Sequence, residues 1–400
     1  MAGSWLVKVA LLSDCYPPRL GGIEVQVHDL ADRLRQRGHE VHVFTATPDD
    51  GADSVVPVHG VPAVPAVPAV HGVPVHRLSI RLPFQLPVNP FAPPALRRML
   101  QDGRFDVAHV HMGVVSPFAV DCTRVTLGLG LPTAMTWHCM LGRATPLVAA
   151  AGYVRRWAQR GVAMSAVSSV AAAAVQRAAD GAGTVSVLPN GLDLRVWRPA
   201  ESVAAVGGAG VQVVTAMRLA ARKRPLPVLR TLRRVRALVP SDRRLRLVVL
   251  GEGPARGRLE RYLARHDMTG WVDLPGRVPR EQLRDRYAAA HLYISPARLE
   301  SFGIAALEAR AVGLPVVSRT GSGVGEFVAD GVDGLLAADD EAMAVAVARL
   351  VTDDALRERI AAHNRAVPPA QSWDQVVRQA EQEYERAREL ARSAALGAVP

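Results

Sequence analysis

The sequence alternates short apolar runs with longer amphipathic segments, and it does so twice along its 400 residues. A short apolar run bounded by turn residues is typical of a buried strand, and apolar residues at helical spacing are typical of a helix that covers a sheet. Strands that alternate with helices predict parallel sheets with helical crossovers. We therefore expect an α/β protein of two Rossmann-like, doubly wound domains that face a central cleft.

The expected N-terminal domain covers residues 1–195, the C-terminal domain covers 196–370, and a closing helix within 371–400 crosses back to the N-terminal domain. Proline recurs every third residue through much of 56–75, which predicts an extended surface loop there. The expected strands of the first domain are 6–13, 40–46, 105–111, 133–137 and 163–167, and those of the second are 211–216, 245–250, 271–274, 291–295 and 315–318.

The chain has a formal net charge of +11, and almost all of its positive charge is arginine, because lysine occurs only at Lys8 and Lys223. This bias is typical of GC-rich codon usage and weakens any inference from charge to nucleic acid, so we expect no nucleic-acid partner. Arg97-Arg98 and Arg155-Arg156 are the candidates for a peripheral contact with the inner membrane face, although ordinary surface exposure is the favoured interpretation.

The location that we expect is the cytoplasm. Cys15, Cys122 and Cys139 are an odd number without metal-ligand spacing, which fits a reducing compartment without a disulfide frame or a zinc site. The N-terminus has no signal-peptide pattern, and no long apolar run predicts a membrane-spanning helix.

The segment around Glu300 and Glu308 carries the most information about function. The two carboxylates bracket a Ser-Phe-Gly turn that opens a helix directly after an apolar strand. A helix start presents unpaired backbone N–H groups and a dipole that favours an anion. Carboxylates beside a phosphate site are reasonable if the ligand also carries hydroxyl groups, and a nucleotide-sugar is such a ligand.

Two further loops provide groups suited to a diphosphate. Arg218 and Lys223 follow the first strand of the second domain, and two cations stabilise a diphosphate both when it is bound and when it departs. Gly21 and Gly22 follow the first strand of the first domain, where paired glycines allow backbone to approach a phosphate, although a simple turn explains them about as well.

Histidines also occur at strand ends of the first domain. His138 follows the strand at 133–137 and is expected to contact the ligand, and His111 is a weaker candidate. A rival interpretation comes from Gly251, Gly253 and Gly257, which nearly match a dinucleotide fingerprint with Asp273 as the ribose acceptor. It predicts an NAD(P)-dependent oxidoreductase but leaves the glutamates and cations without a role.

No Asp-x-Asp occurs in the chain, so a metal-clamped nucleotide-sugar site is disfavoured. We expect no metal and no cofactor, because cationic side chains and helix dipoles would neutralise the diphosphate.

With these residues in place, the chain closely resembles the retaining glycosyltransferase family usually numbered four, glycosyl transferases group 1, which has the GT-B fold. The resemblance runs from Val7 to about Ala380, except for the Pro-Val-Ala loop, and includes the Gly-Gly loop, the Leu-Pro-Asn-Gly-Leu-Asp hinge, the Arg/Lys pair and the two glutamates. It implies transfer of a hexosyl group from GDP-mannose or a UDP-sugar to a hydroxyl acceptor, which could be a glycolipid, a polysaccharide or a small molecule.

The resemblance also implies a role for each site residue. Arg218 and Lys223 would bind the diphosphate while Gly22 closes over it, and Glu308 would accept the ribose hydroxyls. His138 matches a sugar-contacting histidine. The donor sugar would be held by Glu300 and the backbone of Phe302, Gly303 and Ile304, and the base would face Gly276, Arg277 and Val278. The family is thought to use a front-face route in which the departing diphosphate helps to deprotonate the acceptor, so no general base is assigned.

Overall fold

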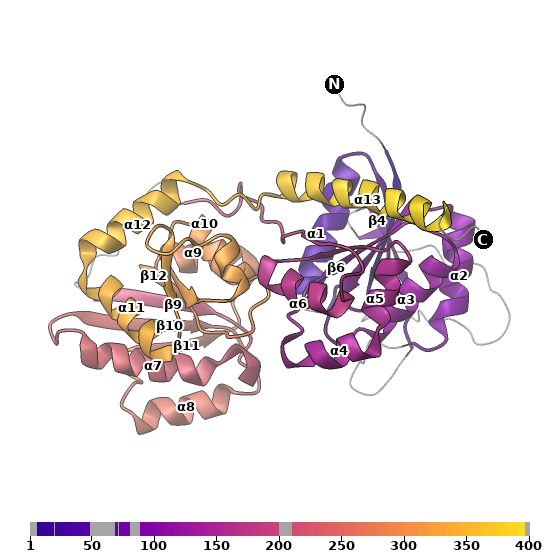
Figure 1. The fold of residues 1–400 in the computed structure, drawn as a ribbon. Helices are drawn as coiled ribbons and strands as arrows, with labels where there is room; N and C mark the ends of the chain where they lie inside the picture. Colours follow the sequence, from indigo (N-terminus) through magenta and orange to yellow (C-terminus); the bar gives the residue numbers. More distant parts are fainter. Residues whose placement is uncertain are drawn as a thin grey trace. The chain divides into compact units, whose positions relative to one another are not determined.

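The computed structural model of the chain describes residues 6–19, 21–48, 69–70, 72–80, 89–199 and 210–396. The chain divides into two compact units: unit 1 is Met1–Gly191 with Trp373–Pro400, and unit 2 is Leu192–Ser372 (Figure 1). Each unit is a Rossmann-like sheet with helices packed on it, which confirms the predicted α/β fold class. None of the helices in the described ranges is long and apolar enough to cross a membrane.

Unit 1 contains an eight-stranded sheet in the order β3-β4-β2-β1-β5-β6-β7-β8, parallel except for the β3–β4 pair. Its strands are β1 (Lys8–Ser13), β2 (Glu40–Thr45), β3 (Ala69–Val70), β4 (Val73–Arg77), β5 (Val107–Met112), β6 (Thr133–Trp137), β7 (Ala163–Ala166) and β8 (Val185–Val187). Its helices are α1 (Gly22–Gln36), α2 (Ala92–Gly103), α3 (Pro117–Gly128), α4 (Thr145–Ala151), α5 (Tyr153–Gln159), α6 (Ser169–Ala179) and α13 (Trp373–Leu396), with a 3-10 turn at Gly142–Ala144.

The expected proline-rich loop at 56–75 is wrong at its C-terminal end, where Val73–Arg77 forms β4; residues 49–68 and 71 lie outside the described range. Pro74 is tolerated in this strand because the pairing of β4 with β2 begins one residue later, at Val75 opposite Val43. Pro74 pairs only with Ala69 of the two-residue strand β3, so its missing N–H removes little from the sheet.

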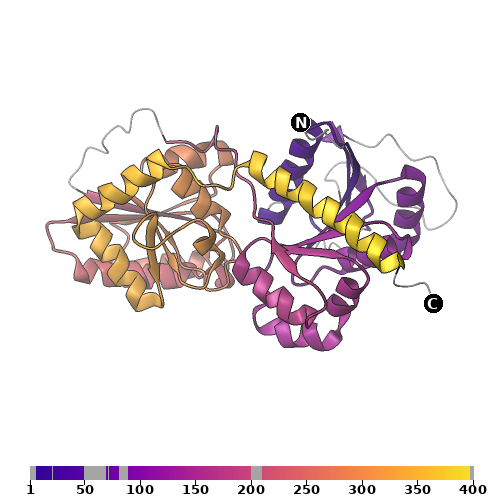
Figure 2. The ribbon, with the colours of Figure 1, turned by 45° about the horizontal axis from the view of Figure 1, so that its top comes forward.

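The last helix, α13, packs on the sheet of unit 1 and contacts β5, β6, β7 and α1 (Figure 2). Its buried residues recur at helical spacing and form one apolar face: Trp373, Val376, Val377, Ala380, Tyr384 and Ala387. Polar contacts secure the same face, since Ser186 donates to Glu383 at 2.6 Å and Arg386 donates to the carbonyl of Met164 at 2.5 Å. These contacts explain why the C-terminal helix belongs to the first unit.

Unit 2 contains a six-stranded parallel sheet in the order β11-β10-β9-β12-β13-β14. Its strands are β9 (Gly210–Ala216), β10 (Arg244–Leu250), β11 (Val272–Gly276), β12 (Leu292–Ser295), β13 (Val316–Arg319) and β14 (Gly334–Ala337). Its helices are α7 (Pro225–Leu238), α8 (Arg256–Arg265), α9 (Arg280–Ala288), α10 (Ile304–Ala311), α11 (Asp340–Thr352) and α12 (Asp354–Ala366), with 3-10 turns at Ala221–Lys223 and Gly323–Glu326.

Strand order creates one switch point in each sheet. In unit 2 the chain leaves β9 toward β10 on one side, while β12 lies on the other side of β9. In unit 1 the same happens at β1, which lies between β2 and β5. Loops that leave adjacent strands in opposite directions open a crevice at the carboxyl edge of a sheet, where open α/β sheets bind their ligands. A ligand site of unit 2 is therefore expected at the loops after β9 and β12.

The turn after β10 explains the near match to a dinucleotide fingerprint. Gly251 has φ +133° and Gly253 has φ +156°, and a Cβ on either would overlap the backbone carbonyl of Met217 or Leu219. Leu219 also donates its N–H to the carbonyl of Glu252 at 2.8 Å. The glycines are thus required by close packing of two loops, and Asp273 is held in an ion pair with Arg246 at 2.6 Å.

We predict that Gly251→Ala destabilises the protein by about 3 kcal/mol or more, because alanine adds both a backbone overlap and a strained positive φ. Gly257→Ala is the matched control, since a Cβ there meets nothing within 4 Å and the residue lies inside α8. That variant should be neutral or stabilised by up to about 1 kcal/mol. Urea unfolding of both variants checks this, and equal stabilities would contradict the packing explanation.

Candidate functional site

The loop after β9 is held by Arg224, which has φ +61° and forms the N-cap of α7. Its guanidinium donates to both carboxylate oxygens of Asp340, at 2.8 and 2.6 Å, and to the carbonyl of Pro296 at 3.1 Å. A left-handed conformation is costly for a residue with a side chain, so bidentate contacts of this kind are needed to maintain it. Arg224 thereby joins the loop after β9 to the loop after β12 and fixes the position of Lys223.

Lys223 and Glu300 meet at the switch point of unit 2. The Nζ atom of Lys223 lies 2.6 Å from Oε2 of Glu300, across 77 residues of sequence. Their side chains are 27% and 13% exposed, so the pair is only partly screened by solvent. The two residues come together because β9 and β12 are neighbours in the sheet. The structure therefore brings a predicted phosphate-binding cation next to a predicted hydroxyl-binding carboxylate.

The start of α10 lies beside this ion pair. Gly303 is the N-cap with φ +92°, a conformation that glycine adopts at little cost, and Phe302 is buried against Phe327 with ring centroids 5.4 Å apart. The first N–H groups of a helix have no partner within the helix. The amides of Ile304 and the residue after it can therefore face an acceptor, whereas the N–H of Ala306 donates to the carbonyl of Gly303 at 2.9 Å. Glu300 is anchored by its carbonyl, which accepts the N–H of Gly323 at 2.8 Å.

Glu308 lies further along α10 and is buried, with 6% of the residue exposed. Its Oε1 is 4.0 Å from Nε of Arg280, the first residue of α9. Tyr287 is fully buried nearby, and burial together with the negative charge of Glu308 raises the pKa of the tyrosine well above its ordinary value. Glu308 is thus a buried carboxylate close to Arg280 and Tyr287, and its oxygens can accept hydrogen bonds from hydroxyl groups.

Three other predicted residues lie in loops at the same carboxyl edge of the unit 2 sheet. Arg218 is exposed and follows β9, and Arg277 and Val278 follow β11, the first exposed and the second half-buried. The sheet order places β10 between β9 and β11, so Arg277 and Val278 are separated from Arg218 by one strand. None of the hydrogen bonds described for this edge joins these three to Lys223 or Glu300.

In unit 1, His111 and His138 are in direct contact. Nδ1 of His111 lies 2.9 Å from Nε2 of His138, and the N–H of His138 donates to the carbonyl of Met112 at 2.8 Å. Both rings are buried, and Nε2 of His111 has no hydrogen-bond partner within the described residues. Burial lowers the pKa of His138 to about 4, partly opposed by a hydrogen bond with Asn190. Both imidazoles are therefore neutral near pH 7.

A third buried histidine, His109, packs against His111. His109 contacts the hydroxyl of Tyr384 at 3.0 Å and that of Thr136 at 2.7 Å, and its ring centroid lies 4.2 Å from that of His111. Burial lowers the pKa of His109 to about 3 and that of His111 well below its ordinary value. The C-terminal helix thus contacts the histidine cluster directly, through Tyr384 on α13.

Gly21 and Gly22 stand at the start of α1 and are both exposed. A Cβ on Gly21 would overlap the carboxylate of the buried Glu24, which lies 3.5 Å from Arg19. Further along α1, the side chain of Gln26 exchanges two hydrogen bonds with the backbone of Gly191, at 3.1 and 2.9 Å. Gly21 therefore has a local packing role in addition to the phosphate-binding role predicted for it.

Sequence reasoning missed Asp14, Asn190 and Arg280. Asp14 directly follows β1 at the switch point of unit 1, and its carboxylate accepts the N–H groups of Phe118 and Ala119 at the start of α3, at 3.1 and 3.3 Å. Burial raises the pKa of Asp14 to about 6. Asp14 could have been found as an acidic residue at a strand end, and Asn190 as the asparagine of the Leu-Pro-Asn-Gly hinge. No signal in the sequence points to Arg280.

The neutral histidines predict a pH dependence of stability. Because the folded pKa of His138 is about 4 and its unfolded value about 6.5, the unfolded chain takes up this proton first as the pH falls. The stability linked to His138 is complete above pH 6.5 and is lost between about 6.5 and 4. Lowering the pH from 7 to 5 should therefore reduce the free energy of unfolding of the wild type by about 2 kcal/mol more than that of His138→Gln.

Urea unfolding at the two pH values measures this difference. The opposite effect of Asp14, whose raised pKa adds stability as the pH falls, is common to both proteins and cancels. The control is Thr352→Ala in unit 2, which removes no titratable group and should keep the wild-type pH dependence. Equal losses in wild type and His138→Gln would contradict the neutral, buried state of His138.

Comparison with known proteins assigns both halves of the chain. The family described as Glycosyl transferases group 1 matches residues 208–367, and the one described as Glycosyltransferase Family 4 matches residues 20–196. A D-inositol 3-phosphate glycosyltransferase of Nocardioides sp. is 30% identical over 94% of this chain and 87% of its own length. A phosphatidyl-myo-inositol mannosyltransferase of Mycobacterium leprae is 29% identical over 91% of this chain and 93% of its own length.

A solved structure agrees with this assignment at the level of the fold. Anabaena HepE in complex with UDP superimposes with a TM-score of 0.72 at 18% identity, covering 94% of this chain and 99% of that one. The oxidoreductase alternative finds no support in these comparisons, and the packing of Gly251 and Gly253 accounts for the motif that suggested it. The chain belongs to the glycosyl transferases group 1 family and is a glycosyltransferase.

Proposed function

We propose that the chain transfers a hexosyl group from a nucleotide-diphosphate sugar, GDP-mannose or a UDP-sugar, to a hydroxyl acceptor with retention of the anomeric configuration. The observation that carries the proposal is the contact of Lys223 with Glu300 at the switch point of unit 2. A cation and a carboxylate at one position suit a ligand that joins a phosphate to a hydroxyl-bearing sugar. A relative named for mannosyl transfer and a structural neighbour bound to UDP support the same donor class.

Within unit 2, we propose a division of roles by charge. Arg218 and Lys223 bind the diphosphate, and Glu300 with the amides of Phe302, Gly303 and Ile304 holds the sugar. Buried Glu308 accepts the ribose hydroxyls, because a desolvated carboxylate forms strong hydrogen bonds with hydroxyl donors. The base faces Arg277 and Val278. This arrangement needs no metal, since the two cations and the start of α10 supply positive potential.

Within unit 1, His138 contacts the donor sugar or the acceptor, supported by His111, and the start of α1 at Gly21 and Gly22 approaches the phosphates. Burial holds His138 neutral at pH 7, so it can donate or accept a hydrogen bond without adding charge. A helix N-terminus such as that of α1 favours a nearby anion.

The proposed reaction is a front-face displacement. The acceptor oxygen forms a bond to the anomeric carbon as the bond between that carbon and the phosphate oxygen breaks, and the acceptor proton passes to the departing diphosphate. Arg218 and Lys223 stabilise the charge that grows on the leaving group. We propose that the reaction takes place in the cytoplasm, consistent with three free cysteines, and that the acceptor is a glycolipid, a polysaccharide or a small molecule.

We predict that Glu308→Ala weakens binding of the true donor at least about tenfold, because a carboxylate–hydroxyl contact contributes about 1.5–3 kcal/mol. The donor is found first with a thermal-shift panel of GDP-mannose, UDP-glucose and UDP-N-acetylglucosamine. At about a hundredfold excess over Kd, the true donor should stabilise the wild type by about 2.7 kcal/mol.

The control for this variant is Glu341→Ala on α11, whose side chain is 55% exposed and paired with Arg234. It should bind the donor as the wild type does. Far-UV circular dichroism of Glu308→Ala checks whether the fold is intact. Wild-type donor affinity in a folded Glu308→Ala protein would eliminate the ribose assignment.

A further inference from the structure

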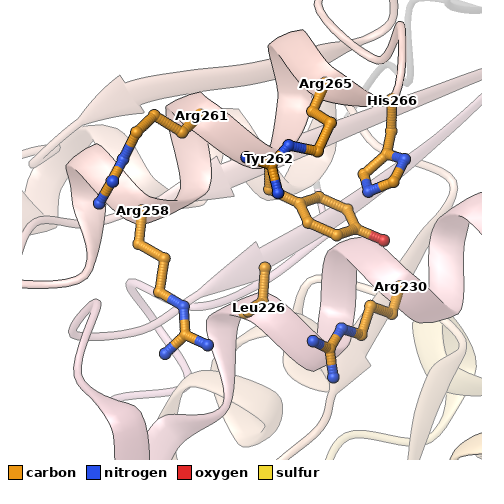
Figure 3. A pocket seen from close by; sticks show the side chains of 7 residues that line it. All are labelled: Leu226, Arg230, Arg258, Arg261, Tyr262, Arg265 and His266. Carbon is orange, nitrogen blue, oxygen red and sulfur yellow. The ribbon is translucent and has the colours of Figure 1, made fainter.

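A second basic feature of unit 2 lies away from the donor loops, between α7 and α8. A hollow of about 400 Å³ is lined by Leu226 and Arg230 of α7 and by a run of residues from α8 and its end: Arg258, Arg261, Tyr262, Arg265 and His266 (Figure 3). Figure 3 shows these side chains extending from the two helices around Leu226 and the Tyr262 ring. A hollow of this size falls within the usual range of small-molecule sites.

The arginines of this hollow, which we call the α7–α8 arginine pocket, are not neutralised by carboxylates. None of Arg230, Arg258, Arg261 and Arg265 forms an ion pair with any residue of the described ranges. The sequence of α7 contains no acidic residue, and Glu260, the only one in α8, is bonded to Arg256 at 2.8 Å.

Elsewhere in this arginine-rich unit, guanidinium groups are commonly paired. Arg243 bonds Asp354 at 2.8 Å, Arg246 bonds Asp273 at 2.6 Å, and Arg310 bonds Asp333 at 2.6 Å. Four unpaired like charges around one hollow repel one another, and an anion bound among them would relieve that repulsion. The pocket therefore differs from an ordinary arginine-rich surface because four arginines without an ion pair in the described ranges gather around one hollow.

The spacing of the arginines suits an anion that carries more than one phosphate. Arg258, Arg261 and Arg265 follow at helical spacing on α8, and the first and last are about 10 Å apart along the helix axis. A row of this length offers room for two or more phosphates on one scaffold to be bound side by side. Guanidinium groups bind phosphate in a bidentate manner, and Leu226 with Tyr262 offers an apolar surface to a carbon ring.

We propose that the α7–α8 arginine pocket binds a small ring compound that carries two or more phosphate groups, either free or as a lipid headgroup. This site is separate from the donor-binding residues, so the proposal does not depend on the proposed transfer reaction. Its connection to them is through α7, which begins two residues after Lys223.

The test uses inositol trisphosphate as the free probe, with the full chain in a Lys223→Ala background that weakens the proposed diphosphate site. Isothermal titration should show that Arg258→Ala/Arg265→Ala lowers the affinity at least about tenfold, since each guanidinium–phosphate contact is charge-assisted. Arg230→Ala, on the facing helix, should also weaken binding.

The matched control is Arg286→Ala/Arg349→Ala, which removes the same charge from two exposed arginines on α9 and α11. It should change the affinity less than about twofold, because long-range charge effects are screened at physiological salt. Equal affinities in the pocket variant and the control, whether both are retained or both are lost, would overturn the proposal.

A second arm identifies the source of the ligand. Phosphatidylcholine vesicles containing phosphatidylinositol bisphosphate are sedimented with the wild type and with Arg258→Ala/Arg265→Ala. Loss of co-sedimentation in the pocket variant assigns the site to a lipid headgroup. Unchanged co-sedimentation, together with lost binding of inositol trisphosphate, assigns it to a free ligand.

Discussion

The contact between Lys223 and Glu300 depends on the order of strands in the second sheet, and the site proposed here depends on that contact. The two residues are far apart in sequence, and their atoms lie 2.6 Å apart because β9 and β12 are neighbours that send their loops in opposite directions. Arg224 adds the second constraint, because its bonds to Asp340 and Pro296 keep the loop after β9 against the loop after β12. A change of strand order or loss of Arg224 would separate the cation from the carboxylate.

Charge is distributed differently in the two units. Unit 2 combines cations, the partly buried Glu300, the buried Glu308 and the start of α10, which is the pattern for a ligand with both phosphates and hydroxyls. In unit 1 the histidine cluster is neutral near pH 7, because burial lowers the pKa of His109, His111 and His138. The cluster therefore offers hydrogen bonds without charge, and α13 stabilises it through Tyr384.

Much of the fold could be predicted because its strands are apolar runs separated by amphipathic helices. The prediction failed where this signal is weak: β8 and β14 are only three and four residues long, and β4 contains a proline. Lys223 and Glu300 could be identified individually, the lysine by its rarity and the glutamate by the glycine turn that follows it. Their contact could not be predicted, because it requires the strand order, and the roles of Arg224 and Arg280 arise only from tertiary packing.

The most direct test of the division of charge is calorimetric binding of a nucleoside diphosphate and of its nucleotide-sugar to Glu300→Gln. If Lys223 serves the diphosphate and Glu300 the sugar, the substitution should weaken nucleotide-sugar binding while nucleoside diphosphate binding is unchanged or stronger, because a carboxylate competing for Lys223 has been removed. Equal weakening of both ligands would contradict the account, since Glu300 would then support the diphosphate site itself.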